Sequence, residues 1–494
     1  MLKRLTVFMA VLFASLALSG YGCVYAANDT WLTEEERIYG LSLIWRHSAE
    51  MSAFLAQTPE DFDWNALYLE YIPRVIAAQD MVEYYEVLSR FTANLHDGKS
   101  AVMFPDGYFF SFVSPISVRY IEGSFIVYAV NSSFTDIPVG SEIMSVDGSD
   151  AKVFLEEYMG DILNLHTPLA REDRLSMLFR ATRRPIEMSL EVVTPDGEEM
   201  AEVIRFISSS RQTDPIRNRD IALSAMYPGG ESISLEDGAY AQVHEGNLHR
   251  IIIPHFQSDN ISESVLQYLE EVAETAQGFI LDVRGNMGGS TDIDILLQFI
   301  DPRELNMFSA YRQVRDARHM AVATAIMAFD FVPDDLWDQY EQGRPFYHGR
   351  LMLESRHLEP LDFNGITDMD DDMIDEMLAE FSLGLFDVPV VILADYATAS
   401  AGDDFVAFAD GVDRFTIIGT NTMGSTGQLA VFSLPGGGTF NLTTNLMLSS
   451  EGRQLNNYGI APDIWVEQGL ADLLDGRDTQ LIAALEYLTE RIAE

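Results

Sequence analysis

Cysteine and lysine are scarce in this chain of 494 residues, and each shortage excludes a class of site. The single cysteine, Cys23, leaves no partner for an internal disulfide and excludes a cysteine-based zinc site. Lysine occurs only as Lys3, Lys99 and Lys152, so a lysine beside any candidate site is notable. Beyond the N-terminus no segment has ~18 uninterrupted apolar residues, so the sequence predicts no later membrane span.

Positive charge is also scarce, because 31 lysines and arginines stand against 77 acidic residues and give a net charge of −46. Such a surface repels phosphate backbones and anionic lipid heads, so we expect neither nucleic acid nor a membrane surface as partner. Hydrophobic residues make up 47% and aromatic residues 11%, which is enough for buried cores and excludes a disordered chain. At ~150 residues per domain, the length predicts roughly three domains.

The N-terminus has the pattern of a secretory signal. A basic start precedes the apolar residues 5–18, and Val24 and Ala26 provide small side chains at the cleavage positions within residues 24–26. We therefore expect a signal peptide over residues 1–26 and a secreted or cell-envelope protein. The alternative is a lipoprotein anchored through Cys23, although Tyr21 and Gly22 make a poor lipid-attachment sequence.

The hydrophobic period changes along the chain and suggests three regions. Three- and four-residue spacing from Thr33 to Arg90 indicates an N-terminal helical region over residues 28–112. Residues 113–208 are rich in predicted strands, which lie at 110–130, 140–148, 186–193 and 202–207 around one helix at 151–158.

The remaining region, residues 209–494, predicts an α/β core with largely parallel pairing, because buried strands alternate with helices. Residues 301–387 form a methionine-rich, acidic insertion, which we interpret as a cap, with a solvated helix at 368–376. The expected strands are 250–254, 278–283 and 390–394, and the expected helices are 262–276, 292–300 and one that opens near Ser400.

Two segments carry candidate chemistry. Residues 281–289 run from a buried strand into a glycine-rich turn, where backbone N–H groups can approach a ligand or an oxyanion, although a purely structural turn is the alternative. The turn is not a Walker loop, because no Gly-Lys-Ser/Thr follows. Ser400 lies among small residues at a strand-to-helix switch, as an acyl-transfer nucleophile requires, although a helix N-cap is the simpler alternative. No Gly-x-Ser-x-Gly motif is present, which speaks against an α/β-hydrolase.

In this order the motifs resemble the C-terminal processing (tail-specific) serine peptidases and their relatives in the tricorn core. The resemblance implies a crotonase/ClpP-like α/β catalytic core, a PDZ-like domain at 113–208 and a catalytic domain at 209–494. It implies Ser400 as the catalytic serine, Gly288, Gly289 and Ala401 as oxyanion donors, an unstructured polypeptide as substrate, and neither metal nor cofactor. The segments that carry it are residues 95–100, 140–148, 280–289, 390–404, 417–428 and 458–464.

The chain departs from the family at each position of the general base. Ser425 stands where the processing peptidases have a lysine, and Lys99 stands where the tricorn-like branch has a histidine. Asn456 stands where the glutamate that assists that histidine is expected. Our hypothesis is a Ser–Lys dyad in which Lys99 activates Ser400, with Ser425 and Asn456 orienting the amine. This requires a lysine pKa lowered from ~10.4 towards ~7–8.

Other interpretations stay open at this point. Lys99 is alternatively a surface cation near Asp97 in an inactive site, or His96 is the base. An inactive member of the family would act as a peptide- or lipid-binding protein, or as an envelope scaffold that works through its PDZ-like domain.

Overall fold

The computed structural model describes residues 31–59, 62–105, 112–163, 167–208, 221–222, 232–289, 294–300, 309–314, 357–361, 386–449 and 451–493. The chain forms two compact units, and each is described by itself. The helical unit comprises Met1–Asp106, Phe308–Glu376 and Thr426–Asn456. The sheet unit comprises Gly107–Met307, Met377–Ser425 and Asn457–Glu494.

The helical unit begins with α2 (Glu34–Met51), α3 (Trp64–Ala77) and α4 (Met81–Ala93), with the short η1 (Phe54–Ala56) after α2. Thr33 opens α2 with a capping box, and aspartates cap the next two helices. Tyr84, Tyr85 and Phe91 on α4 are buried where the three helices meet. Three α-helices therefore make up most of residues 34–93 in the predicted N-terminal helical region.

A feature that the sequence did not indicate is that residues 426–456 complete this unit. Strands β20 (Leu429–Ser433) and β21 (Thr439–Thr443) form an antiparallel sheet with β1 (Ala101–Met103), and Phe440 and Leu442 enter the core of the three helices. A second small sheet joins β17 (His357–Leu361), β16 (Ser309–Val314) and β22 (Asn445–Leu448).

The sheet unit begins with a β-rich region, residues 112–208, that agrees closely with the predicted strands. One sheet has the order β11-β4-β5-β8-β9 with β3 and β6 at its side, and a smaller sheet has the order β10-β2-β7. The Pro195–Gly197 turn joins β8 to β9. The elements are β2 (Phe112–Val113), β3 (Ile116–Ile121), β4 (Ser124–Val130), β5 (Glu142–Val146), β6 (Ser149–Asp150), α5 (Ala151–Met159), α6 (Pro168–Leu175), η2 (Ser176–Phe179), β7 (Ala181–Thr182), β8 (Glu187–Val193), β9 (Glu199–Arg205), β10 (Ile207–Ser208) and β11 (Ile221–Ala222).

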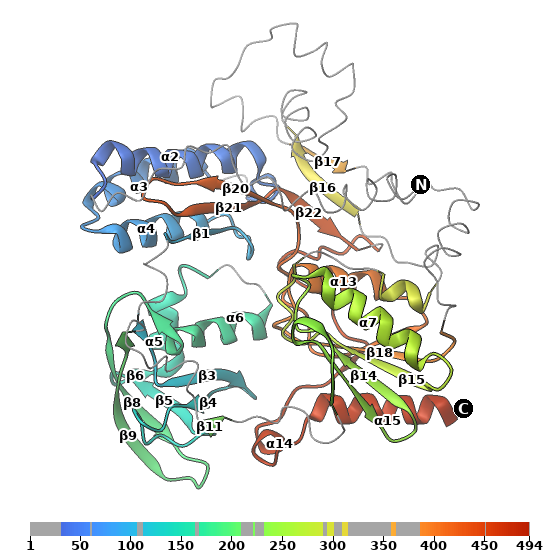
Figure 1. The fold of residues 1–494 in the computed structure, drawn as a ribbon. Coiled ribbons are helices and arrows are strands. Elements are labelled where there is room, and N and C mark those ends of the chain that lie inside the picture. The colour runs from blue at the N-terminus through green and yellow to red at the C-terminus, as the bar shows by residue number, and fades with distance from the viewer. Residues whose placement is uncertain are drawn as a thin grey trace, which may run out of the picture. The chain divides into compact units, whose positions relative to one another are not determined.

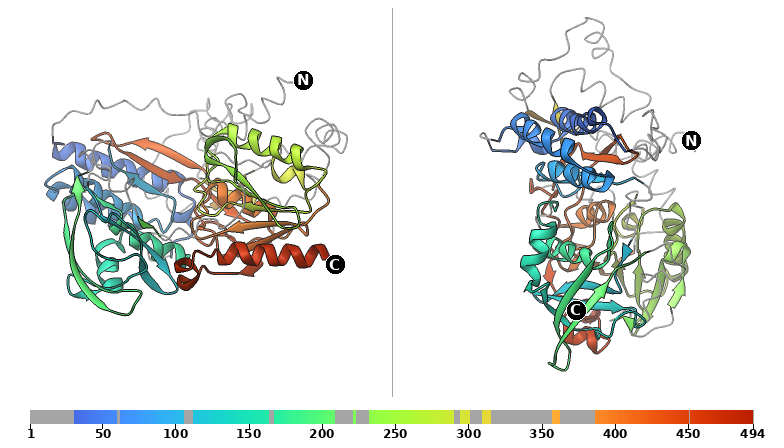
Figure 2. Two further views of the ribbon diagram at one scale, coloured as in Figure 1. Left: turned by 60° about the horizontal axis from the view of Figure 1, so that its bottom comes forward. Right: turned by 90° about the vertical axis from the view of Figure 1, so that its left-hand side faces the viewer.

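The second sheet of this unit has the order β12-β13-β14-β15-β18-β19-β23 and is parallel from β14 onward. Its strands β14, β15 and β18 are buried along their whole length, as in a sheet that is covered on both faces. Helices α7 and α13 lie on one face and α15 covers the other, and Figure 2 shows α15 in red beside the strands (Figures 1 and 2). The elements are β12 (Ser232–Ser234), η3 (Glu236–Gly238), β13 (Tyr240–His244), β14 (Leu248–Ile252), α7 (Asp259–Val272), β15 (Gly278–Asp282), β18 (Val390–Ala394), α13 (Ala401–Ala409), β19 (Phe415–Gly419), β23 (Ile464–Trp465), α14 (Leu470–Leu474) and α15 (Thr479–Ala493).

One predicted helix is wrong. In place of a helix over residues 292–300, the described part of that segment contains a single short turn, η4 (Leu296–Gln298). Ile295, Leu296 and Phe299 are all buried, so one tight turn is enough to place these apolar side chains in the core. The predicted signal peptide, most of the 301–387 insertion and its acidic helix lie outside the described residues. Within the part that is described, no helix is both long and apolar enough to cross a membrane.

Candidate active site

The candidate nucleophile lies at the end of a buried parallel strand. β18 ends at Ala394, and after a short loop Ser400 forms the N-cap of α13. Ser400 has φ 57° and ψ −122°, a backbone conformation that a serine adopts only when its surroundings hold it. Ala401 is the first residue of the helix, so its N–H has no partner within the helix. Ser400 is therefore the N-cap residue of a helix, and it also lies at the strand-to-helix switch that a catalytic serine would occupy.

The glycine-rich turn packs directly against this serine. A Cβ on Gly288 would lie 2.6 Å from the Cβ of Ser400 and 2.7 Å from the nitrogen of Ala401. Gly288 also has φ 91°, which favours glycine. The N–H of Ala399 donates to the carbonyl of Asn286 at 2.8 Å, which ties the two segments together. The two motifs that the sequence singled out are thus in contact within one unit.

The three predicted oxyanion donors differ in the contacts that their backbone groups make. The N–H of Gly288 donates to Oδ1 of Asn286 at 2.8 Å, so it is already engaged. Gly289 forms an isolated parallel bridge with Phe256, and a Cβ there would meet the Phe256 carbonyl oxygen at 2.0 Å. The Ala401 N–H lies at the start of α13, where the helix dipole favours negative charge. Their assignment as oxyanion donors stays a prediction.

Asp395 holds the two turns in register. Its Oδ1 accepts hydrogen bonds from the N–H of Gly285 at 2.9 Å and of Ala397 at 3.0 Å. The hydroxyl of Thr398 adds a bond to the carbonyl of Val283 at 2.9 Å. The loop that carries the nucleophile and the glycine-rich turn are therefore joined by side chains as well as by backbone.

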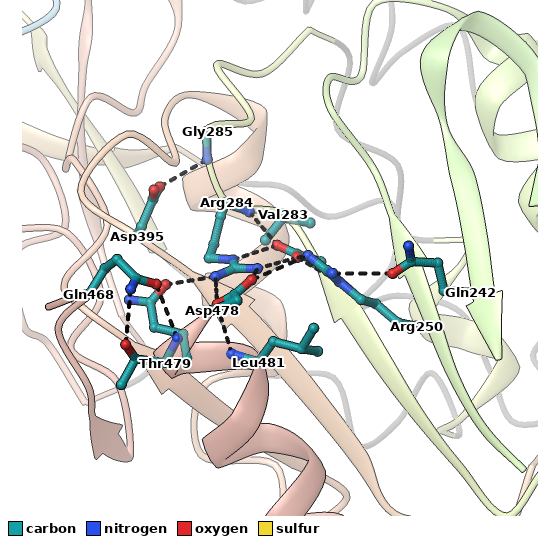
Figure 3. Close-up of polar contacts among 12 residues, drawn as sticks. Gln242, Arg250, Val283, Arg284, Gly285, Asp395, Gln468, Asp478, Thr479 and Leu481 are labelled. Atoms are coloured by element: carbon teal, nitrogen blue, oxygen red, sulfur yellow. Dashed lines mark hydrogen bonds and ion pairs between the residues drawn. The ribbon is translucent and has the colours of Figure 1, made fainter. Parts of the chain in front are cut away.

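A buried network of four charges stands beneath the glycine-rich turn (Figure 3). Arg250 on β14 pairs with Asp282 at the end of β15, and Arg284 binds Asp282 and, at 2.8 Å, Asp478. Burial acts to raise the pKa of Asp282, but Arg284 and Arg250 together hold it well below its usual range. Asp478 also accepts from the N–H of Leu481 at 2.9 Å and so caps α15. The network connects the start of the turn to the opposite face of the sheet.

Asp403 is a further residue of the site that the sequence analysis did not single out. It lies on the first turn of α13, is only 1% exposed, and binds the N–H of Ser400 at 3.0 Å. It also accepts from the N–H groups of Gly424 at 3.0 Å and Ser425 at 2.9 Å. The Ser-x-x-Asp spacing of a capping box was the signal that could have found it.

The β-rich region contacts the same loops through α6 and the residue before it. The hydroxyl of Thr167 donates to the carbonyl of Met423 at 3.0 Å, and Met423 packs with Ala399 and Tyr396. The hydroxyl of Tyr396 donates to Asp173 on α6 at 3.4 Å, and burial raises the pKa of this carboxyl. The β-rich region thus contacts Tyr396, in the loop before Ser400, and Met423, which packs against Ala399.

The remaining predicted residues divide between the two units. Ser425 is in the sheet unit, half-buried, and its carbonyl accepts from the N–H of Ser400 at 3.0 Å. Lys99 and Asn456 are in the helical unit. The half-buried Lys99 donates from Nζ to the carbonyl of Gly427 at 2.7 Å. The pairing of Lys99 with Ser400 stays a prediction.

Two observations in the helical unit bear on the alternatives for the base. The side chain of Asn456 is 1% exposed and is held by backbone groups, accepting from the N–H of Met447 at 2.6 Å and donating to the carbonyl of Thr426 at 2.8 Å. His96 is exposed, with φ 54°, and its neighbour Asp97 is buried. Asp97 accepts from the backbone N–H of Lys99 at 3.2 Å.

Among the residues that the structure describes, no group of three or more histidines, cysteines, aspartates and glutamates is placed to hold a metal ion. The chemistry that the described residues offer is that of a serine hydroxyl, backbone N–H groups and buried carboxylates.

Residues 248–466 match the sequence profile of Peptidase family S41, a range that contains Ser400, the glycine-rich turn and Asn456. This part of the chain belongs to peptidase family S41. The resemblance seen in the sequence is thereby confirmed, and the α/β fold with N-terminal helices and β-rich regions is similar to that of S41 peptidases.

Curated relatives of this S41 region match over short stretches. A carboxy-terminal-processing protease of Bartonella bacilliformis is 33% identical over 93 residues, which is 19% of this chain and 21% of that protein. A carboxyl-terminal-processing protease of Synechocystis sp. is 31% identical over 110 residues, 22% of this chain and 26% of that protein. The matched stretches thus span about a fifth to a quarter of each relative's length.

The fold is similar over a much larger part of the chain. The crystal structure of mature CPAF superimposes with a TM-score of 0.65, covering 93% of this chain and 98% of that one at 15% identity. At this identity the likeness concerns the fold alone.

Proposed function

We propose that this S41 family member is a serine peptidase that hydrolyses peptide bonds of unstructured polypeptides through an acyl-enzyme on Ser400. The observation that carries the proposal is the conformation of Ser400. It stands with φ 57° at the N-cap of α13, packed against Gly288, at the carboxyl end of parallel strands. A structural N-cap needs no such conformation, because N-cap residues ordinarily have extended backbone angles.

The proposed chemistry is acyl transfer. Lys99 takes the proton of the Ser400 hydroxyl, the oxygen attacks the peptide carbonyl, and the N–H groups of Ala401 and Gly289 stabilise the oxyanion. The C–N bond then breaks as Lys99 gives the proton to the leaving amine, and water hydrolyses the acyl-enzyme to release the acid and free Ser400. Ala401 is favoured because it is the N1 residue of a helix, whereas the Gly288 N–H is bound to Asn286. The carbonyl of Gly427 accepts from Nζ of Lys99 and so fixes the direction of the amine.

We further propose that the β-rich region is a PDZ-like module that captures the substrate chain by strand addition. Its attachment to Tyr396, in the loop before Ser400, and to Met423, after β19, would deliver a bound chain beside the nucleophile. We place the protein outside the cytoplasm, secreted or in the cell envelope, with the 301–387 insertion as a cap that limits access.

Degradation of an unfolded protein tests the proposal. Wild type, Ser400→Ala, Lys99→Ala and His96→Ala would be compared on β-casein between pH 6 and 10, with equal folding checked by circular dichroism. We expect cleavage by wild type and His96→Ala and none by the other two. Activity retained in Lys99→Ala would exclude the dyad, and activity retained in Ser400→Ala would exclude the acyl-enzyme.

The second candidate is an inactive family member that binds a peptide or lipid. It is favoured by Asn456, whose amide is occupied by the backbone of Met447 and Thr426 instead of orienting a base. This candidate predicts that folded wild type leaves β-casein intact and retains a bound ligand through purification. Mass spectrometry of the denatured protein would detect that ligand.

A further inference from the structure

We infer that Asp403 is a positioning residue for Ser400, in that its buried carboxylate holds the backbone of the nucleophile and the neighbouring loop in the reactive arrangement. This inference rests on the proposed role of Ser400 as nucleophile.

The starting point is the burial of a charged side chain. Asp403 is 1% exposed, and a buried carboxylate is costly unless hydrogen-bond donors surround it. The donors here are backbone N–H groups, and the position at the first turn of α13 adds the favourable end of the helix dipole. Charge-assisted bonds of this type are about twice as strong as neutral ones.

The donors come from two separate segments of the chain. Oδ2 accepts from the N–H groups of Ser400 at 3.0 Å and Ser425 at 2.9 Å, and Oδ1 accepts from Gly424 at 3.0 Å. The same segments are bonded directly, since the Ser400 N–H is also 3.0 Å from the carbonyl of Ser425. One carboxylate thus clamps residues 424–425 against the nucleophile.

The clamp acts where the backbone needs support. A non-glycine residue with the φ and ψ of Ser400 is strained, and it keeps this conformation only if its neighbours hold it there. The bond from the Ser400 N–H to Asp403 fixes the peptide plane that precedes the serine. Loss of that bond would let the peptide rotate, and the direction of the Oγ would change with it.

Asp403 does not touch the reacting atoms in this scheme. Its effect should therefore fall on the rate of reaction at Ser400 and leave substrate binding unchanged. Asp404 provides the matched control, because it is the next residue of the same helix and Asp404→Asn removes the same charge.

Hydrogen exchange tests the clamp without any reference to activity. In Asp403→Asn, one oxygen acceptor becomes an N–H₂ donor that faces backbone N–H groups. We expect amide exchange in peptides containing Ser400 and residues 424–425 to rise at least about 10-fold, and to stay at the wild-type rate in Asp404→Asn. Unchanged exchange in a folded Asp403→Asn protein would overturn the inference.

Reaction with a fluorophosphonate probe tests the consequence for the serine. The Oγ–P bond forms, the P–F bond breaks, fluoride leaves and the hydroxyl proton passes to the base. We expect Asp403→Asn to react about 10- to 100-fold more slowly than wild type, since small misplacements of a reacting group have effects of this size. Binding of β-casein, measured on a Ser400→Ala background, should stay within about twofold.

A third variant covers the case in which Asp403→Asn does not fold. Asp403→Glu keeps the carboxylate, so we expect a folded protein whose labelling rate lies between those of wild type and Asp403→Asn. If Asp403→Asn does not fold, the labelling rate of Asp403→Glu should lie within about 10-fold of that of wild type. A folded Asp403→Glu that is not labelled would overturn the inference. If wild type itself is not labelled, the proposed function fails, and the exchange experiment alone decides the role of Asp403.

Discussion

At the scale of single residues, the site is shaped by the absence of side chains as much as by their presence. Ser400 and Gly288 approach so closely that a single carbon added to Gly288 would collide with the serine. Gly285, three residues earlier in the same turn, also has positive φ, 70°, but a Cβ there would meet no atom within 4 Å. The two glycines therefore separate the effect of backbone conformation from the effect of crowding at the nucleophile.

The first prediction compares alanine at these two glycines. Both variants strain a left-handed backbone, so Gly285→Ala should lower the free energy of unfolding by about 1 kcal/mol and keep fluorophosphonate labelling. Gly288→Ala adds overpacking, so we expect a loss of about 2–4 kcal/mol and no labelling. Urea denaturation and the labelling rate measure both effects. Equal labelling of the two variants would show that the turn does not define the position of Ser400.

At the scale of elements, local patterns predicted the strands and helices well. β18 was predicted with its observed limits because five buried apolar residues end at a polar loop. The helix expected at 292–300 was wrong because a short apolar run does not distinguish a helix from a buried turn. The inclusion of β20 and β21 in the helical unit could not be foreseen, since β1 and β21 pair across more than 300 residues of sequence.

The same limit applies to the candidate site. Ser400 and the glycine-rich turn carry local signals of strand, turn and small residues, and the structure brings them into contact. The network of Arg250, Arg284 and Asp478 has no local signal, because its members lie on β14, after β15 and before α15. Spacing along a chain shows neighbours on one element but not pairs that form only when the sheet assembles.

That network gives a prediction about element packing. Asp478→Asn keeps an oxygen that can cap α15 but leaves Arg284 without one of its buried partners, so the free energy of unfolding should fall by about 3 kcal/mol. Asp475→Asn is the control, since Asp475 is 68% exposed and its pair with Arg477 contributes ~0–1 kcal/mol. Urea denaturation at pH 7 measures the difference. Equal effects would mean that the network adds nothing beyond a surface pair.

At the scale of the whole molecule, two opposing responses to acid follow from the charge and the histidines. The net charge of −46 destabilises the folded chain by repulsion, and protonation of carboxylates near pH 4 relieves it. Burial lowers the pKa of His47 in the helical unit and of His244 and His249 in the sheet unit. Because ordinary carboxylates stay ionised above about pH 5, the histidines should dominate between pH 7.5 and 5.5.

In that window we expect the protein to lose stability as the pH falls. A histidine whose pKa is lower in the folded state contributes stability that is present above its unfolded pKa of ~6.5 and lost below it, so the unfolding free energy should drop by about 1–2 kcal/mol from pH 7.5 to 5.5.

His249 is 4% exposed and 2.7 Å from the hydroxyl of Tyr268, so His249→Gln keeps a hydrogen-bonding side chain but removes the titration. It should flatten the pH dependence, whereas His96→Gln, at an exposed position, should not. Urea denaturation at several pH values, followed by fluorescence and circular dichroism, measures the slope. A slope that is the same in wild type and His249→Gln would assign the acid response to groups other than this histidine.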